Sequence, residues 1–217
     1  MKIYYREKSG GIEILRCFGI EGRVEIPGMI EDKLVISAAP YAFSSHMDEK
    51  EELKNACLWE MSDGLGFGRE EHVLAGKDVE EIVFPDTLKE IGRYIFYGCG
   101  NLRKLEFSDS LMQIGCGAFT GCHALEKLTV HMRQGKKSGV KEMLGEMWQR
   151  IDVNFLYEYE EARLVFPEHY DEAVENTPAR ILYTEYHGSG SNYRQCFYDR
   201  VQESVDAAEE LLDELGA

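Results

Sequence analysis

The sequence predicts an α/β-type solenoid, in which short parallel strands stack side by side and short helices or turns form the back. Six apolar or cysteine positions recur with pairwise numbers that differ by 23: Ile82 and Leu105, Leu88 and Leu111, Ile91 and Ile114, Phe96 and Phe119, Cys99 and Cys122, Leu102 and Leu125. Two Gly-Cys pairs keep the same register. A fixed period of this length indicates stacked repeats, each made of one short strand and a turn of helix.

Period-2 alternation assigns a direction to each side chain of the repeated strands. Ile82, Phe84, Leu105 and Phe107 are expected to point into the core. The residues between them then form one outward face, which a solenoid commonly presents as a concave binding surface. Its members are Glu81, Val83, Lys104, Glu106, Lys127, Thr129 and His131. Gly92 and Gly115 are predicted to occupy tight turns, where a side chain would clash.

The N-terminal segment is predicted to be a β-hairpin cap. Residues 2–6 and 12–18 alternate as strands around a glycine turn, and a third strand begins at Val24. A stack of repeats exposes apolar edges at both ends, so its terminal units must differ from the middle ones. We therefore expect the hairpin to close the N-terminal end of the array.

A degenerate first repeat follows the hairpin. Phe43 aligns with Phe119, Ala38 with Ile114 and Val35 with Leu111. The pattern then breaks, and residues 44–75 are predicted to be a helical insertion. Acidic residues crowd the start of 48–59, with Leu53 and the following apolar positions on one side, which favours a helix. Residues 62–68 are predicted to be a flexible glycine link.

The second part of the chain, residues 132–217, is predicted to be an α+β C-terminal cap or small subdomain. The repeat domain accordingly spans residues 1–131. In the second part the sequence favours a helix at 140–148, strands at 151–159, 163–166 and 179–186, and a helix at 168–176. The strand at 163–166 is expected to add to the sheet of the repeats. An acidic amphipathic helix is predicted from residue 201 to 217, as a cap or as a surface for self-association.

Charge and composition exclude several functional classes. Forty acidic residues against 24 basic ones give a net charge of −16, which disfavours binding to nucleic acid and to anionic membranes. Nothing approaches the ~18 apolar residues of a membrane span, so we expect no membrane insertion. The N-terminus lacks an apolar run behind a basic start. A cytoplasmic location is expected, or the cell surface if a leader has been removed.

Candidate chemistry is weak throughout the sequence. Six dispersed cysteines without a C-x2-C pair predict buried free thiols at Cys99 and Cys122 and no metal site. The glycines of 64–68 do not match a phosphate-binding loop. Neither the Cys122–His123 dipeptide nor His187 has a nameable catalytic partner. We therefore predict no enzymatic activity and no cofactor.

The repeat pattern resembles that of the BspA-like leucine-rich repeats, a bacterial family with a 23-residue unit. The motif covers roughly residues 20–131 and is carried in its first clear unit by Phe84-Pro85, Leu88, Ile91-Gly92, Ile95-Phe96, Gly98-Cys99 and Leu102. The second clear unit has Ser108 where the first has its proline. The resemblance implies a leucine-rich repeat fold, and a role in adhesion or partner binding at a cell surface.

The leading functional hypothesis is a non-enzymatic scaffold that binds an unidentified protein partner through the concave sheet of the repeats. One alternative is a ligand-binding or enzymatic unit in residues 132–217, with the repeats as scaffold. A second alternative is a surface adhesin. Four basic residues could also dock an acidic partner: Arg133, Lys136, Lys137 and Lys141.

Overall fold

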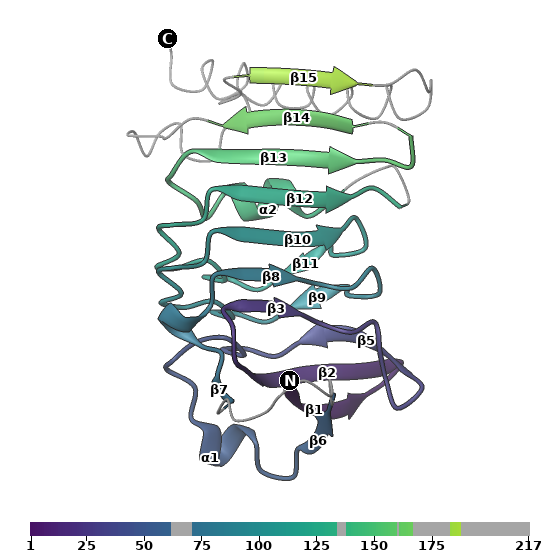
Figure 1. The fold of residues 1–217 in the computed structure, drawn as a ribbon, viewed down its shortest axis with the longest axis vertical. Helices are drawn as coiled ribbons and strands as arrows, with labels where there is room; N and C mark the ends of the chain where they lie inside the picture. Colours follow the sequence, from purple (N-terminus) through teal and green to yellow (C-terminus); the bar gives the residue numbers. More distant parts are fainter. Residues whose placement is uncertain (62–70, 134–137, 160, 167–182, 188–217) are drawn as a thin grey trace.

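The computed structural model describes residues 1–61, 71–133, 138–159, 161–166 and 183–187, the last range by its backbone alone. The chain winds as a β-solenoid, and its strands stack along the long axis of the molecule (Figure 1). One sheet has seven strands in the order β15-β14-β13-β12-β10-β8-β3. A second sheet runs β11-β9-β5-β2-β1-β6, with β4 and β7 paired to its strands.

The seven-stranded sheet confirms the predicted stacking of the repeats. Its strands are β3 (Arg23–Glu25), β8 (Glu81–Val83), β10 (Lys104–Ser108), β12 (Lys127–His131), β13 (Ile151–Leu156), β14 (Glu161–Phe166) and β15 (Tyr183–His187). Strands β3 to β13 are parallel, and the last two pairings are antiparallel. One residue from each parallel strand forms a continuous inward row, buried throughout: Val24, Ile82, Leu105, Leu128 and Val153.

The backs of the two clear coils are short strands followed by turns, so the turns of the predicted helical or turn backs are present and the helices are not. Strands β9 (Glu90–Ile91) and β11 (Gln113–Ile114) are followed by turns. The N–H groups of Tyr94, Phe96 and Gly98 donate to carbonyl oxygens of the next coil, over 3.0–3.1 Å. Because these donors are used between coils, they cannot form the hydrogen bonds within the segment that a helix needs.

The hairpin expected at the N-terminus is present as β1 (Lys2–Lys8) and β2 (Gly11–Gly19), which pair antiparallel. Strand β2 also pairs in parallel with β5 (Lys33–Ala38), and β5 pairs with β9. The two-residue strands β4 (Met29–Ile30) and β7 (His72–Val73) pair with β5 and β2. The hairpin is therefore continuous with the back sheet of the solenoid.

The predicted helix over 48–59 is largely wrong. Helix α1 covers only Glu49–Glu52, and β6 (Cys57–Glu60) then pairs with β1. Asn55 adopts a left-handed φ of 63°, which ends helical geometry and redirects the chain. The strand places Trp59 opposite the buried Ile3, so burial of an aromatic against the hairpin outweighs helix formation. The glycine link at 62–68 lies outside the described residues.

The degenerate first unit takes its place in the stack through an aromatic column. Phe43, Phe96 and Phe119 pack in succession, with ring centroids 5.6 and 5.5 Å apart. Beside them, the Cys99 thiol donates to the Phe43 carbonyl at 3.2 Å, and the Cys122 thiol donates to the Phe96 carbonyl at 3.3 Å. The column and the thiol contacts together fix the register between successive coils.

The second part of the chain continues the sheet beyond His131. The expected strands at 151–159 and 163–166 appear as β13 and β14, and β13 pairs in parallel with β12. The expected strand at 179–186 is seen in part, as β15. The expected helix at 140–148 is shorter, as α2 (Val140–Leu144). The helices expected at 168–176 and 201–217 lie outside the described residues, and the domain boundary at 131 stays a prediction.

Glu146, just after α2, substitutes for a missing coil. In earlier coils, backbone carbonyls of the next coil accept from the N–H groups of Tyr94 and Phe96. At the equivalent positions one period later, Gly117 and Phe119 donate instead to the two carboxylate oxygens of Glu146, at 2.7 and 3.3 Å. The carboxylate thus ends the back ladder without leaving these donors unpaired.

Replacing Glu146 with alanine is expected to lower the free energy of unfolding by about 1.5–3 kcal/mol, because two N–H groups lose a charged acceptor. Glu146→Gln should cost less, since its amide oxygen still accepts one bond. Guanidinium denaturation measures both. Glu142→Ala, at an exposed position in the adjacent helix α2, is the matched control. A loss at Glu146 no larger than at Glu142 contradicts this role.

Candidate binding face

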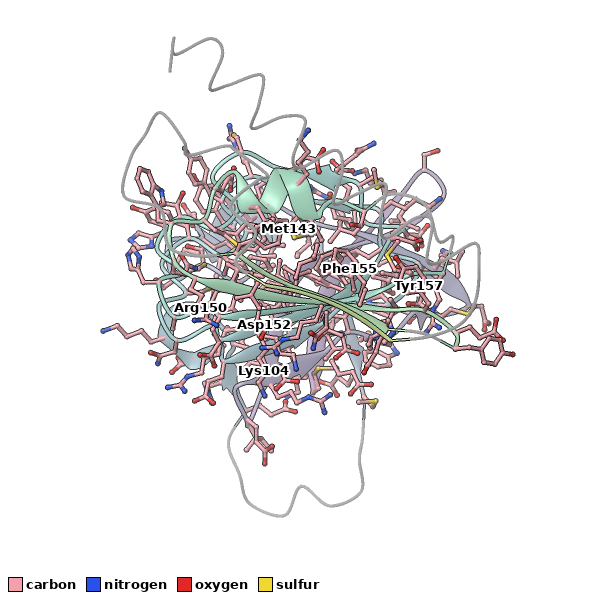
Figure 2. All side chains as sticks on the ribbon, turned by 90° about the horizontal axis from the view of Figure 1, so that it is seen from above. Lys104, Met143, Arg150, Asp152, Phe155 and Tyr157 are labelled. Carbon is pink, nitrogen blue, oxygen red and sulfur yellow. The ribbon has the colours of Figure 1, made fainter. Side chains whose placement is uncertain are left out.

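The seven predicted site residues all lie on the outward side of the seven-stranded sheet. Glu81 and Val83 come from β8, Lys104 and Glu106 from β10, and the rest from β12. Lys104 is exposed and the other six are half-buried, while the residues between them are buried. Figure 2 shows Lys104 on the opposite side of the sheet from Met143 of α2.

The outward face is wider than the sequence prediction. Arg23 and Glu25 extend it on β3, Asp152 and Asn154 on β13, and Arg163 on β14. The alternation of Ile151, Val153 and Phe155 with polar residues was a usable sequence signal, because it repeats the apolar alternation of β10 and β12. We call these five residues and the seven predicted ones the outer face.

Most charges of the outer face are paired across neighbouring strands. Arg23 Nε lies 3.1 Å from Glu81 Oε1. His131 Nε2 lies 2.7 Å from Glu106 Oε1. These cross-strand contacts hold the polar side chains in fixed positions and supply little net stability, because exposed ion pairs are weak.

On β14, Arg163 engages Asp152 on the adjacent strand. Its Nε donates to the two carboxylate oxygens at 2.9 and 3.0 Å, and its terminal nitrogen donates to the same group. Two donors on one carboxylate fix the relative orientation of both side chains. This pair lies on the two C-terminal strands of the outer face whose side chains the structure describes.

Lys104 and Lys127 are the exception in this network. They are direct neighbours in the parallel register of β10 and β12. Lys104 reaches Glu81 only at 3.9 Å. Within the described part of the chain, Lys127 has no carboxylate within 4.0 Å. Two like charges thus sit side by side with weak compensation.

The basic cluster expected near residue 133 is described only in part. Arg133 pairs with Asp86 at 2.7 Å, at the edge of the outer face. Lys141 lines an open depression beside Ile114, together with Glu142, Gly145 and Glu146. Lys136 and Lys137 lie outside the described residues. The contacts described for Arg133 and for Lys141 have no residue in common.

Candidate catalytic and metal groups remain isolated in the described ranges. Cys122 is buried and its thiol is engaged with the Phe96 carbonyl. Among the residues that the structure describes, no three metal-binding side chains come together. None of the described helices is long and apolar enough to cross a membrane. His187 lies in β15, and its side chain is outside the description.

Three buried thiols are held in their protonated form. Burial raises the pKa of Cys17 and of Cys99 to about 12, and it raises the pKa of Cys122 further. A raised thiol pKa means that the neutral form is favoured in the folded state, so stability is lost only as the pH rises above the ordinary thiol range. The reactive thiolate is therefore scarce at pH 8.

We expect iodoacetamide at pH 8 to modify Cys57 and Cys116, which are exposed, and to spare Cys17, Cys99 and Cys122. Peptide mass spectrometry after a timed reaction reads out each site. Unfolding in guanidinium provides the control, because it should make all five reactive. Rapid modification of Cys99 in the folded protein would contradict the buried ladder of thiols.

These features define a repeat scaffold of the leucine-rich repeat class, with a core of stacked coils and a polar outer sheet. Residues 70–139 match the family model described as "BspA type Leucine rich repeat region (6 copies)". Over residues 70–139 this chain thus carries BspA-type leucine-rich repeats. A search of curated proteins found no match.

Three solved structures are similar to this chain. A leucine-rich repeat protein from Bacteroides ovatus gives a TM-score of 0.39 at 23% identity, over 60% of this chain and 30% of that one. A leucine rich cell surface protein from Faecalibacterium prausnitzii gives 0.36 at 16%, over 58% and 34%. The T. pallidum leucine rich repeat protein gives 0.29 at 22%, over 71% and 79%. This chain thus spans about a third of the length of the first two.

Proposed function

We propose that this protein is a non-enzymatic scaffold that binds a protein partner through the outer face. The observation that carries the proposal is the continuous polar surface built by β3, β8, β10, β12, β13 and β14, in which ordered charged side chains alternate with core residues. Repeat proteins use such extended surfaces for binding. The hairpin β1–β2 extends the back sheet on its N-terminal side, and β13 and β14 extend the seven-stranded sheet beyond the repeats.

The charged side chains of the outer face suit the recognition of a partner protein. Its charges are held in place by cross-strand pairs, so a partner meets a preorganised pattern. Preorganised side chains lose less conformational entropy on binding. Charge complementarity then contributes mainly specificity and association rate.

Two outward substitutions test the proposal, Val83→Arg combined with Thr129→Arg. Both positions are half-buried at the centre of the outer face. Immobilised protein is incubated with lysate of the source cell, and captured proteins are quantified by mass spectrometry. The double variant should lose a specific partner by about tenfold or more, which corresponds to about 1.4 kcal/mol.

The matched control is Met112→Arg combined with Thr120→Arg, which adds the same charge at exposed positions away from the outer face. The control should retain the partner. Unchanged capture by the Val83 and Thr129 variant, or equal loss by both variants, would remove the outer face as the binding surface.

The expected cytoplasmic location is also a proposal. Free thiols at Cys17, Cys99 and Cys122, without a disulfide among the described residues, suit a reducing compartment. Fractionation of the source cell with an antibody against the protein tests this location. Recovery in the surface fraction would favour the adhesin alternative instead.

A further inference from the structure

Lys104 and Lys127 form an unusual pair for a sheet surface. The parallel register places them directly opposite each other on β10 and β12. Like charges in this position destabilise a sheet. The Lys104 side chain is 54% exposed, so its ammonium group is available to a partner. The pair lies at the centre of the outer face, within a chain whose net charge is −16.

The carboxylates that could neutralise the pair are engaged elsewhere. Glu81 is closer to Arg23, at 3.1 Å, than to Lys104, at 3.9 Å. Glu106 contacts His131 at 2.7 Å. These contacts leave the positive charge of Lys104 only weakly compensated from its own strand and from β8.

Strand β13, which lies next to β12, also supplies no carboxylate to the lysine pair. Asp152 on β13 is the direct neighbour of Lys127 in the register. It accepts hydrogen bonds from Arg163 at 2.9 and 3.0 Å instead. The described residues therefore leave Lys127 without an ion-pair partner, although three carboxylates lie on adjacent positions of the sheet.

We propose that Lys104 and Lys127 together bind a carboxylate of an extended, acidic segment of the partner protein. This inference rests on the proposed function and assigns the chemistry of its partner. Adjacent strands are about 4.8 Å apart, which lets one carboxylate lie between two ammonium groups. The Thr129 hydroxyl, on the same face of β12, offers a further donor.

An acidic protein segment fits this site better than a polyanion. Glu81 on β8 is the direct neighbour of Lys104, and Glu106 lies on the same face of β10, so a densely charged phosphate backbone would meet repulsion. A spaced row of carboxylates in an extended chain has its charges on one side only, because alternate side chains face alike. One of these carboxylates can then lie between the two lysines.

The probe is a fluorescein-labelled peptide of alternating glutamate and serine, titrated with the full chain and followed by fluorescence anisotropy. Lys104→Glu combined with Lys127→Glu should weaken binding by about tenfold or more, and added salt should weaken binding to the wild type. Lys54→Glu combined with Lys77→Glu changes the net charge equally at exposed positions elsewhere. It should change binding by less than about twofold.

Carbodiimide coupling then maps the contact, because it joins a peptide carboxylate directly to a lysine amine. Mass spectrometry should find the peptide on Lys104 or Lys127. If the charge-reversed variant does not fold by circular dichroism, Lys104→Gln combined with Lys127→Gln replaces it. A peptide of alternating phosphoserine and serine is run in parallel.

Three results would overturn the inference: no binding by the wild type, equal loss in both double variants, or coupling only at other lysines. Preference for the phosphoserine peptide with no binding of the glutamate peptide would also overturn it. Loss of partner capture in the Val83 and Thr129 variant would in that case still support the outer face. The two failures can therefore be told apart.

Discussion

Replacing Phe96 with alanine should lower the free energy of unfolding by about 3–5 kcal/mol, the range for removing a buried phenylalanine. Phe96 is fully buried, and its ring packs against Phe43 on one side and Phe119 on the other. It also contacts Phe84, which follows β8 of the seven-stranded sheet, with ring centroids 6.2 Å apart. The cavity would thus open between three successive coils, which have little freedom to collapse.

The measurement is equilibrium denaturation in guanidinium, with Phe96→Leu as the graded comparison. Leucine retains most of the apolar volume, so its loss should be clearly smaller. Met112→Ala, at a side chain that is 43% exposed, should change stability by less than about 0.5 kcal/mol. A small loss for Phe96→Ala would show that the aromatic column does not join the coils.

Gly92→Ala is the second substitution with a large expected effect. A Cβ atom at Gly92 would lie 2.3 Å from the backbone nitrogen of Pro40 and 2.6 Å from the carbonyl carbon of Ala39. Both contacts are with backbone of the preceding coil, which cannot move without separating the stack. We expect a loss of about 3 kcal/mol, at the upper end of overpacking effects.

Gly100→Ala is the matched control for Gly92 in the same coil. Its added Cβ would meet nothing closer than the Gly121 carbonyl oxygen at 3.9 Å. Thermal unfolding followed by circular dichroism should place this variant near the wild type. If the two variants melt together, the close approach of successive coils at Gly92 is wrong.

Gly92 and Gly115 were predicted to be required, but for a reason that differs from the one the structure shows. The sequence suggested tight turns, whereas neither Gly92 nor Gly115 has a positive φ. The missing side chain is needed because the preceding coil approaches: a Cβ at Gly115 would lie 2.2 Å from the backbone nitrogen of Arg93. A repeating glycine marks both situations, and one sequence cannot separate them.

The seven-stranded sheet was predictable because burial sets the alternation of apolar and polar residues along its strands. The alternation of Ile82 with its neighbours fixes which side chains face the core, and the 23-residue period fixes the register. The back was not predictable from the same pattern. Whether its N–H groups bond within the segment or to the next coil depends on contacts that periodicity does not encode.

Local composition misled the reading of residues 48–59, where acidic residues and apolar spacing favoured a helix. The structure ends α1 at Glu52 and forms β6, because Trp59 can pack beside Ile3. The long-range pairing with β1 decided the outcome. Glu146 was missed for a similar reason: its role depends on two N–H groups that lie 29 and 27 residues earlier.

The outer face was predicted at its centre and missed at its edges. The repeat motif located Lys104 and Lys127, because both occupy the same place in a 23-residue unit. Asp152 and Arg163 lie beyond the motif, and only the strand at 163–166 was expected to add to the sheet of the repeats. Their mutual contact is what isolates the lysine pair, and no sequence pattern indicated it.

Methyl NOE spectroscopy on protein labelled at isoleucine, leucine and valine tests the stacking of the coils most directly. The structure predicts short-range NOEs that connect Ile82 to Leu105 and Leu105 to Leu128, as expected for buried neighbours on parallel strands. The absence of both connections, with Leu105 methyl groups contacting other residues instead, would contradict the solenoid and the outer face built on it.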